Sequence, residues 1–345
     1  NSENSNPDLG LIGAGVEVPI LNGLIIDESR RNYRIQKINV QKQIFSNDST
    51  ENVIIANSLN SYIEWSVSYY KLKALDSLLQ IRKLRYDNIL NLFRGGILPA
   101  MDTLDAFTQL KKTEQELLFN KALYNKSLFK LQNYVWNPEY LDKLDSIVPD
   151  ESYSLLLALI IDKDVLDVAE HNFIKANRLR EQQSKINIRF YAEQFKPKIN
   201  LELLPLAALS EGVDGFSRNN FMTGVNIELP LYYRKQTNYF KINKLELENI
   251  KYQSDLLERK LNTSLNAATL NVGLYKAQYD ISIENVANLV VLKNLEEERY
   301  LMGESSLIKL NLRENKYISE QLKAFDVLSK YCLELVSLNN LLQVY

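Results

Sequence analysis

Two aspartates three positions apart have the spacing in this chain that points most plainly to chemistry. Asp102 and Asp105 lie in the stretch GILPAMDTLDA at 96–106. Residues three apart share one face of a helix. A pair of carboxylates on one face attracts cations, but such a pair is equally a feature of a solvated helix surface. The sequence alone leaves both interpretations open.

The other reactive residue types indicate packing. The single histidine, His171, has no second His or Cys to complete a metal site, and indicates a packed or solvated position on a helix. The single cysteine, Cys332, falls at helical spacing with Leu328 and Leu335, which predicts a buried small apolar residue. No nucleophile elbow or phosphate-binding loop occurs, so we expect no enzyme activity, no metal and no cofactor.

The composition excludes several classes of protein. The 345 residues include 41 basic and 43 acidic side chains with no basic block, which argues against a nucleic-acid partner. One cysteine cannot form an internal disulfide. No apolar run reaches the roughly 18 residues of a membrane-spanning helix, which argues against a helical membrane protein.

The elements that position these residues occur twice along the chain. Residues 16–20 (VEVPI) recur as 227–231 (IELPL), and the glycine-led stretch at 96–106 has its counterpart in GESSLIKLNLR at 303–313. Each half therefore predicts a strand, a proline, a very long helix, a glycine turn and a returning helix. An internal repeat of this kind defines the architecture before any single motif does.

The strands are predicted by alternation of apolar and polar residues. Residues 11–21 and 221–233 alternate over about ten positions, the length that crosses a bilayer in a barrel, and 198–209 forms a third, more apolar strand. Glu17 and Glu228 fall on the face opposite the apolar residues, where either a barrel lumen or bulk solvent would hydrate them. Pro19 and Pro230 cannot donate ladder hydrogen bonds, so we expect them where strand gives way to helix.

The helices are predicted by apolar residues spaced alternately four and three apart. This rhythm runs from Ile63 to Leu84 and from Leu261 to Leu289, within long helices at about 22–94 and 234–302. A mean spacing of 3.5 predicts left-handed coiled-coil packing, and each arm would be roughly 110 Å long. Returning helices are expected to about 134 and over 304–343, with a further helix at 162–195.

The turns at the ends of the long helices contain residues suited to a reversal. Gly96 and Gly303 tolerate the positive φ of a helix C-cap, within tip turns such as 95–99. Pro99 suits the first turn of the first returning helix, and Ser306 suits the N-cap of the second. An ordinary helical hairpin would use the same residues.

Taken together, these features resemble the TolC-like outer-membrane efflux protein family over nearly the whole chain. The matching residues are 18–20 and 96–106 in the first half, and 228–231 and 299–307 (RYLMGESSL) in the second. The latter, followed by REN at 313–315, is similar to the version found in Bacteroidota. We expect repeat 1 at 1–135, an equatorial linker at 136–161 and repeat 2 at 162–345.

The resemblance implies a mainly α protein with membrane β-structure. It implies a homotrimer in which each protomer gives four strands to a shared 12-stranded barrel in outer-membrane lipid, continued by a helical barrel across the periplasm of a Gram-negative bacterium. The protein would be a passive duct in a tripartite efflux or type I secretion system, with a periplasmic adaptor and an inner-membrane pump. Glu17 and Glu228 would line the barrel lumen.

The resemblance also gives roles to the tip residues. Asp102 and Asp105 match the paired aspartates at the periplasmic entrance of family members, although in the best-known members that pair lies on the other hairpin, where this chain has Lys309 and Leu312. Adaptor docking is expected at exposed apolar side chains beside the turns. These are Leu98, Met101, Leu301, Met302 and Leu307, together with the turn residues Gly96, Pro99, Gly303 and Ser306.

The chain departs from the family in showing three strands per protomer instead of four. We expect the first helix and strand to lie upstream of Asn1, because an odd strand would leave an unpaired edge in lipid. The alternative from another class is a soluble coiled-coil scaffold or adaptor protein with a small β-domain.

Overall fold

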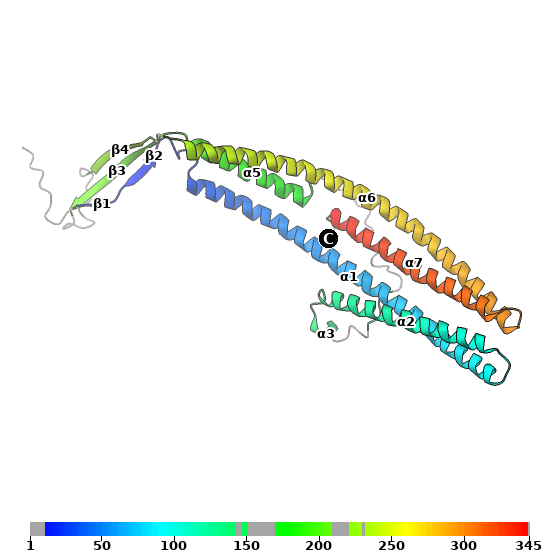
Figure 1. Cartoon of the computed structure of the whole chain (residues 1–345). Helices are drawn as coiled ribbons and strands as arrows, with labels where there is room; N and C mark the ends of the chain where they lie inside the picture. Colours follow the sequence, from blue (N-terminus) through cyan, green and yellow to red (C-terminus); the bar gives the residue numbers. More distant parts are fainter. Residues whose placement is uncertain (1–10, 142–146, 151–169, 209–220, 230–231, 344–345) are drawn as a thin grey trace, which may run out of the picture. The chain divides into compact units, whose positions relative to one another are not determined.

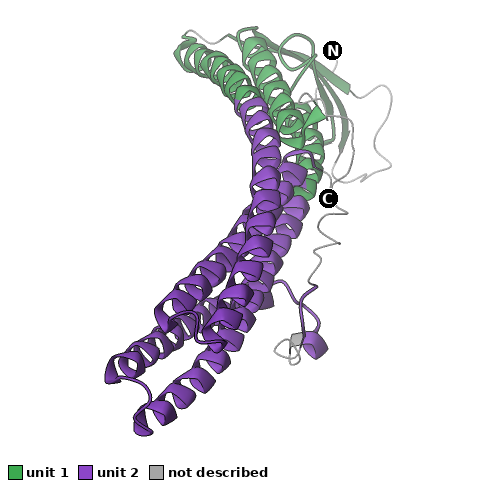
Figure 2. Cartoon of the chain, turned by 90° about the vertical axis from the view of Figure 1, so that its right-hand side faces the viewer, with its two compact units in different colours: residues 1–48, 168–259 green, residues 49–167, 260–345 purple. Residues whose placement is uncertain are grey.

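The computed structural model describes residues 11–141, 147–150, 170–208, 221–229 and 232–343. They fall into two compact units, coloured separately in Figure 2: unit 1 comprises 1–48 and 168–259, and unit 2 comprises 49–167 and 260–345. Helices α1 (Glu28–Arg94) and α6 (Arg234–Leu301) belong to both. The units therefore cut across the two sequence repeats, and the division at 136–161 remains a prediction.

Unit 1 contains an antiparallel sheet with β3 (Lys198–Ala208) at its centre, as Figure 1 shows. On one side of β3 lie β1 (Leu11–Gly13) and β2 (Val16–Pro19), one after the other, and on the other side lies β4 (Phe221–Glu228). The register places Val18 opposite Leu201, and Leu201 opposite Val225. These three side chains therefore share one face.

The two faces of the sheet differ in chemistry. The apolar face is exposed, and its side chains are Val16, Val18, Leu201, Leu203, Val225 and Ile227. On the opposite face the Asn200 amide donates to Glu17, and Lys198 forms an ion pair with Glu228 at 3.1 Å. Glu17 and Glu228 thus lie on the polar face, as the alternation predicts.

The strand predicted at 11–21 is interrupted. It forms two short strands separated at Ala14 and Gly15. A Cβ on Gly15 would lie 2.5 Å from the carbonyl oxygen of Leu203, so a side chain could not fit between the strands here. Period-two alternation does not detect this break, because the alternation continues on both sides of it.

Helix α5 (Asn172–Glu193) packs between α1 and α6 within unit 1 through buried polar groups. Gln183 donates to Asn39 of α1 at 2.6 Å, and the Ser184 hydroxyl donates to the carbonyl of Asn243 in α6 at 3.3 Å. The helix predicted at 162–195 is wrong in its start, because His171 has extended backbone geometry and caps α5. Residues 162–169 lie outside the described residues.

Unit 2 consists of two helical hairpins, α1 with α2 (Ala100–Gln132) and α6 with α7 (Leu307–Leu341). Buried clusters join α1 to α7 along their length. Ile63 and Val67 pack with Leu328 and Cys332, and nearer the turns Leu75 packs with Ile318. The burial predicted for Cys332 is confirmed.

The apolar residues predicted to form the packing seam of α1, from Ile63 to Leu84, are buried only over the first part of that stretch. Ile63, Val67 and Tyr70 are buried, but Ile81 and Leu84 are 44% and 67% exposed. The seam therefore leaves the helical core before the end of α1, because the residues that face the partner helices there are Leu75, Leu78 and Ile89. Of the described helices, none has both the length and the apolar composition that crossing a bilayer requires.

The helix ends are set by capping side chains that the periodicity does not reveal. Helix α1 begins at Glu28 and not near 22, because the carboxylate of Asp27 accepts the backbone N–H of Arg30 at 2.6 Å. Helix α7 begins at Leu307 and not at 304, because Ser306 occupies the N-cap. A short helix, α3 (Pro138–Leu141), follows α2.

Candidate functional site at the hairpin turns

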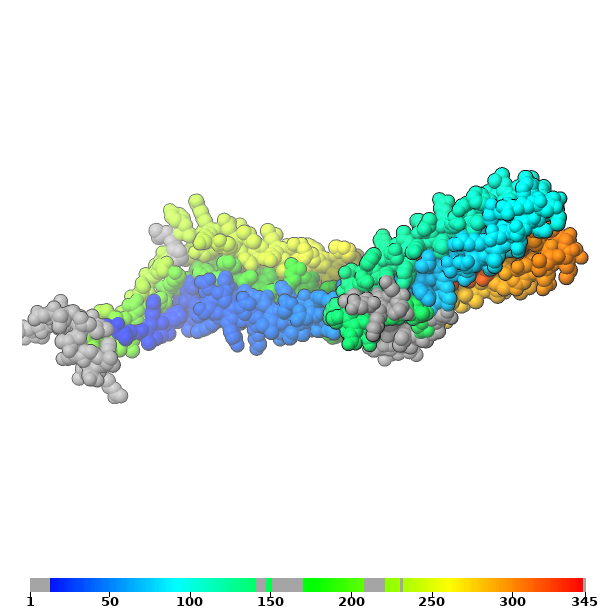
Figure 3. Space-filling view, turned by 90° about the horizontal axis from the view of Figure 1, so that it is seen from below, coloured from blue at the N-terminus to red at the C-terminus, as the bar shows by residue number. Residues whose placement is uncertain are grey.

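The two hairpin turns of unit 2 lie side by side, as the cyan and orange ends in Figure 3 show. Gly96 and Gly303 have φ values of +72° and +77°, so the left-handed conformation predicted for both is confirmed. A Cβ at either glycine would meet nothing within 4 Å. Backbone conformation, and not crowding, is therefore what favours glycine at these turns.

The caps predicted beside the turns are present with one difference. The Ser306 hydroxyl accepts the backbone N–H of Lys309 at 3.4 Å, which confirms the N-cap. Pro99 lies at the N-cap of α2 and not in its first turn, and its carbonyl accepts the N–H of Asp102 at 3.2 Å. Both returning helices therefore start with their first N–H groups partly satisfied.

The apolar residues at the turns divide into exposed and packed groups. Met101 and Leu301 are 74% and 78% exposed, and Met302 is exposed as well. The exposure predicted for Leu307 is wrong: it is only 6% exposed and packs with Ile89 and Ala106. Leu98 is partly buried against the same cluster. Leu98 and Leu307 thus help to hold the two hairpins together, because they pack in the apolar cluster that lies next to the turns.

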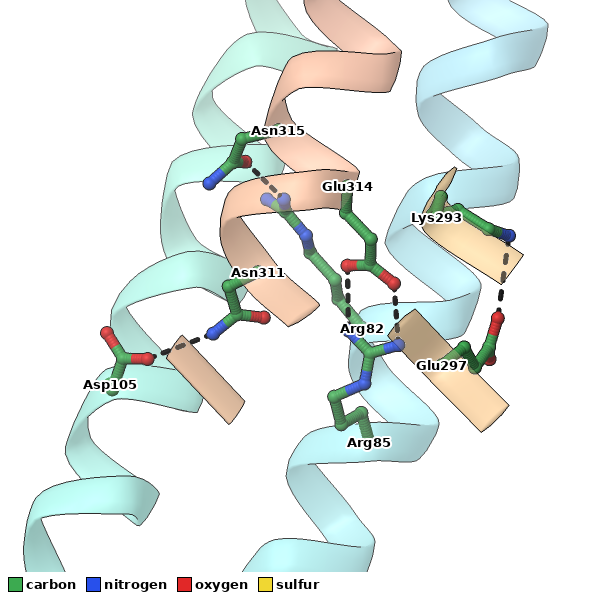
Figure 4. A network of polar contacts seen from close by, with 8 residues as sticks. All are labelled: Arg82, Arg85, Asp105, Lys293, Glu297, Asn311, Glu314 and Asn315. Carbon is green, nitrogen blue, oxygen red and sulfur yellow. Dashed lines mark hydrogen bonds and ion pairs between the residues drawn. The ribbon is translucent and has the colours of Figure 1, made fainter. Parts of the chain in front are cut away.

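The two aspartates occupy different surroundings although both lie on α2. The Asp105 carboxylate accepts a hydrogen bond from the Asn311 amide of α7 at 2.9 Å, as Figure 4 shows. Asp102 is partly buried and Lys309 is exposed. Asp105 therefore links the two hairpins, a contact that spacing along one helix could not predict.

A buried ion pair lies one to two turns further along the helices. Arg85 of α1 donates two hydrogen bonds to Glu314 of α7, at 2.7 and 2.6 Å, and the two side chains are 13% and 4% exposed. Burial alone would lower the pKa of Arg85, but the hydrogen bonds and charge of Glu314 outweigh it and raise that pKa. The cation and the carboxylate stabilise each other in this position.

A second arginine, Arg82, crosses the same space and forms no ion pair with a carboxylate of the described residues. Arg82 is 4% exposed and donates to the Thr113 hydroxyl, to the carbonyl of Gln109 at 3.1 Å and to the amide oxygen of Asn315 at 2.7 Å. Burial lowers the pKa of Arg82, against the opposing charges of Glu314 and Glu116. The Arg82 guanidinium thus ties three helices together through neutral acceptors. Figure 4 shows its hydrogen bond to Asn315 of α7.

A separate polar cluster holds the α6–α7 turn. The Ser305 hydroxyl donates to Glu296, and Arg313 lies 3.8 Å from the same carboxylate. The hydrogen bond from Ser305, followed by the charges of Arg299, Arg313 and Lys309, lowers the pKa of Glu296. This carboxylate stays ionised and fixes the turn against the end of α6.

A cleft of about 680 Å³ opens beside these residues within unit 2. Apolar side chains of α1 line one side, including the exposed Ile81 and Leu84, and Glu297 and Tyr300 of α6 line the other. The exposed end of the predicted α1 seam therefore forms a wall of this cleft. Among the described residues, no group of three or more His, Cys, Asp or Glu side chains is placed to hold a metal ion.

The site residues that sequence reasoning missed are Arg82, Arg85, Asn311 and Glu314. The heptad rhythm predicted apolar packing positions on α1 and α6, and it assigned no role to the charged residues between those positions. A usable signal existed: Arg82 and Arg85 flank the seam position Leu84. Of the remaining predicted residues, Pro19 ends β2, and Pro230 lies outside the described residues.

Comparisons with known proteins return solved structures only. No protein-family model matches the sequence, and neither does any curated protein. The CmeC outer membrane channel of Campylobacter jejuni matches with a TM-score of 0.77 and 14% identity, over 96% of this chain and 77% of that one. VceC, an outer membrane protein of Vibrio cholerae, gives 0.73 and 15% over 96% and 86%.

A membrane protein from Pseudomonas aeruginosa also matches, with a TM-score of 0.77 and 12% identity over 96% of this chain and 83% of that one. The fold class predicted from the sequence is confirmed: long helical hairpins continuous with a few strands, as in outer-membrane channels. At these identities the similarity extends to the fold and no further.

Proposed function

We propose that this chain, with the fold of outer-membrane channels, is the subunit of a passive export duct in the outer membrane that extends into the periplasm. The observation that carries the proposal is the sheet of unit 1, whose apolar face is exposed while its polar face holds Glu17, Lys198 and Glu228. A sheet with one lipid-compatible face and one hydrated face suits the wall of a membrane barrel. Neighbouring copies would complete that barrel.

The helices support assembly of several copies. Large apolar side chains are exposed along α2 and α6, and they include Leu104, Leu118, Phe119, Leu270, Leu274 and Ile281. Contiguous exposed apolar surface on long helices favours burial against another chain. We take the assembly to be a homotrimer, in which α2 of one copy meets α6 of the next.

The hairpin turns would form the periplasmic entrance. In a threefold assembly Asp102, Asp105 and Lys309 would place charges around the opening. Within each copy the Arg85–Glu314 pair and the Asp105–Asn311 hydrogen bond hold α7 to the first hairpin. Release of these contacts would let the second hairpin move outward and widen the opening.

Export through such a duct needs partners, because no residue of the chain points to an energy source. Met101, Leu301 and Met302 are exposed at the turns and offer apolar contacts to a periplasmic adaptor, which would couple the duct to an inner-membrane pump. Leu98 and Leu307, being packed, would support these contacts from behind.

Reconstitution of the purified protein tests the proposal. We expect a detergent-dependent trimer by light scattering, and discrete conductance steps in planar bilayers. Asp102→Asn should alter conductance or block by multivalent cations. A monomer that stays soluble without detergent and never conducts would refute the duct and favour the scaffold.

A further inference from the structure

The loop between β2 and α1 holds two apolar side chains outward. Leu24 and Ile25 are 53% and 63% exposed, while the next residue, Ile26, is 2% exposed and anchors the loop. Gly23 has a φ of +86°, which allows the turn. The loop thus has a defined conformation that presents two aliphatic side chains to its surroundings.

Two polar contacts fix this conformation. The Asn22 amide donates to the carbonyl of Lys196 at 3.0 Å, and the Arg30 guanidinium donates to the carbonyl of Leu24 at 2.6 Å. The loop is therefore tied both to the chain between α5 and β3 and to the first turn of α1. Because its backbone is held in place, the exposure of Leu24 and Ile25 belongs to the structure of unit 1.

The helix ends around this loop are rich in cations. The stretches 22–37, 189–198 and 232–244 contain only three acidic residues, Asp27, Glu28 and Glu193. Their basic side chains are Arg30, Arg31, Arg34, Lys37, Arg189, Lys196, Lys198, Arg234, Lys235, Lys241 and Lys244. Among these, Arg34, Lys235 and Lys241 are exposed and form no ion pair with any described residue.

Aromatic contacts place these stretches at one level of unit 1. The Arg31 guanidinium lies 4.4 Å from the ring centre of Phe190, and Tyr191 stacks on Tyr239 at 5.2 Å. The start of α1, the end of α5 and the start of α6 therefore lie together. Tyr232, two positions before the start of α6, is exposed.

We infer that this junction of strands and helices binds a phospholipid surface, with Leu24 and Ile25 among the acyl chains and Arg34, Lys235 and Lys241 at the phosphates of anionic headgroups. The inference deepens the proposed function, on which it rests. The exposed apolar residues Val16, Val18 and Ile20 precede Leu24 and Ile25 by a few positions in the sequence, so exposed apolar side chains occur both on the sheet and in the loop that follows it. Tyrosine and basic residues are typical of the interface between bilayer and water.

The partner is a lipid and not a nucleic acid, because exposed aliphatic side chains lie within the same loop. Each exposed cation near the bilayer surface should strengthen the association of the protein with anionic lipid about fivefold. Loss of three cations should therefore remove most of any preference for anionic over zwitterionic lipid.

Two measurements on the full chain reconstituted in phosphatidylcholine vesicles test the inference. The first is the association of spin-labelled phosphatidylglycerol relative to spin-labelled phosphatidylcholine. We expect a severalfold preference in the wild type that weakens with salt and disappears in Arg34→Gln/Lys235→Gln/Lys241→Gln. The matched control is Lys251→Gln/Lys260→Gln/Lys276→Gln, which removes three exposed cations elsewhere on α6 and should keep the preference.

The second measurement uses a fluorophore attached at Leu24→Cys or Ile25→Cys, with lipids carrying quenching nitroxides. We expect the lipid nitroxides to quench the fluorophore at both positions. We expect no quenching at Val40→Cys, which places the fluorophore at an exposed position further along α1. Absence of lipid preference together with absence of quenching, in protein that forms channels, would overturn this inference alone. Protein that neither enters vesicles nor conducts would overturn the proposed function with it.

Discussion

The Arg85–Glu314 pair gives the sharpest prediction, through Glu314→Gln. The substitution keeps the size of the side chain but removes its charge and one of its two acceptor oxygens. The buried Arg82 and the 13%-exposed Arg85 would then lie near each other without a carboxylate between them. Removing one partner of a buried pair destabilises a protein by about 3–5 kcal/mol, far more than an exposed pair contributes.

In the proposed duct, the same change should favour the open form. If the pair forms only while the hairpins are together, a loss of about 3 kcal/mol changes the ratio of closed to open forms by roughly 150-fold. We therefore expect Glu314→Gln to lower the unfolding temperature and to raise the mean conductance of single channels in planar bilayers.

A matched control lies on the same helix. Glu320 pairs with Lys323 at 3.5 Å, and the two side chains are 21% and 59% exposed, against 4% and 13% for Glu314 and Arg85. Because solvent screens this i,i+3 pair more strongly, Glu320→Gln should leave both readings near the wild type. A double-mutant cycle with Arg85→Gln should give a coupling free energy of more than about 1 kcal/mol. Wild-type stability and conductance in Glu314→Gln would refute the reasoning, since a buried pair cannot lose its anion without effect.

Further predictions concern single positions. Gly303→Ala should destabilise the turn by about 1–2 kcal/mol, and Gly303→Asn by less, because the cost is one of positive φ in open space; equal unfolding temperatures for the two would argue otherwise. Burial lowers the pKa of His171 below its ordinary value of 6.5, so the unfolded chain binds the proton more readily. The contribution of the neutral imidazole to the free energy of unfolding is complete above pH 6.5 and is lost as the pH falls through the lowered pKa. His171→Asn keeps a capping side chain, so thermal melts of this variant should no longer show that pH dependence of stability. Burial raises the pKa of Cys332 to about 12, so the thiol should resist labelling until denaturant is added, and rapid native labelling would contradict its burial. If the proposed duct docks an adaptor at its turns, Met101→Asp with Leu301→Asp should weaken adaptor-dependent export while trimers still form, and unimpaired export would exclude docking at these side chains.

Features that depend only on residues a few positions apart in the sequence could be predicted. The alternation around Glu17, the left-handed glycines and the Ser306 cap are each determined by neighbours in sequence, and each was predictable. The break at Gly15 was not, because it depends on the carbonyl of Leu203 in another strand. The cap at His171 was missed because histidine is not among the usual capping residues.

The position of the site at the hairpin turns was predictable, but the residues that form its contacts were not. The turns mark where the hairpins end, yet the contacts that join them involve residues remote in sequence, such as Arg85 with Glu314. The resemblance led us to expect Leu307 at the surface as a docking residue, but it is packed against neighbours from α1 and α2. Such pairings follow from how the helices pack, which periodicity along one helix does not specify.

The burial of Cys332 has a consequence for the chain in an oxidising environment. The only thiol of the protein is enclosed by Val67, Leu328 and Leu335, and it is 1% exposed. Once folded, it is shielded from oxidants and from forming cross-links with other chains. Oxidation or cross-linking of this thiol therefore requires that α1 and α7 be apart, either before they pack or after they separate.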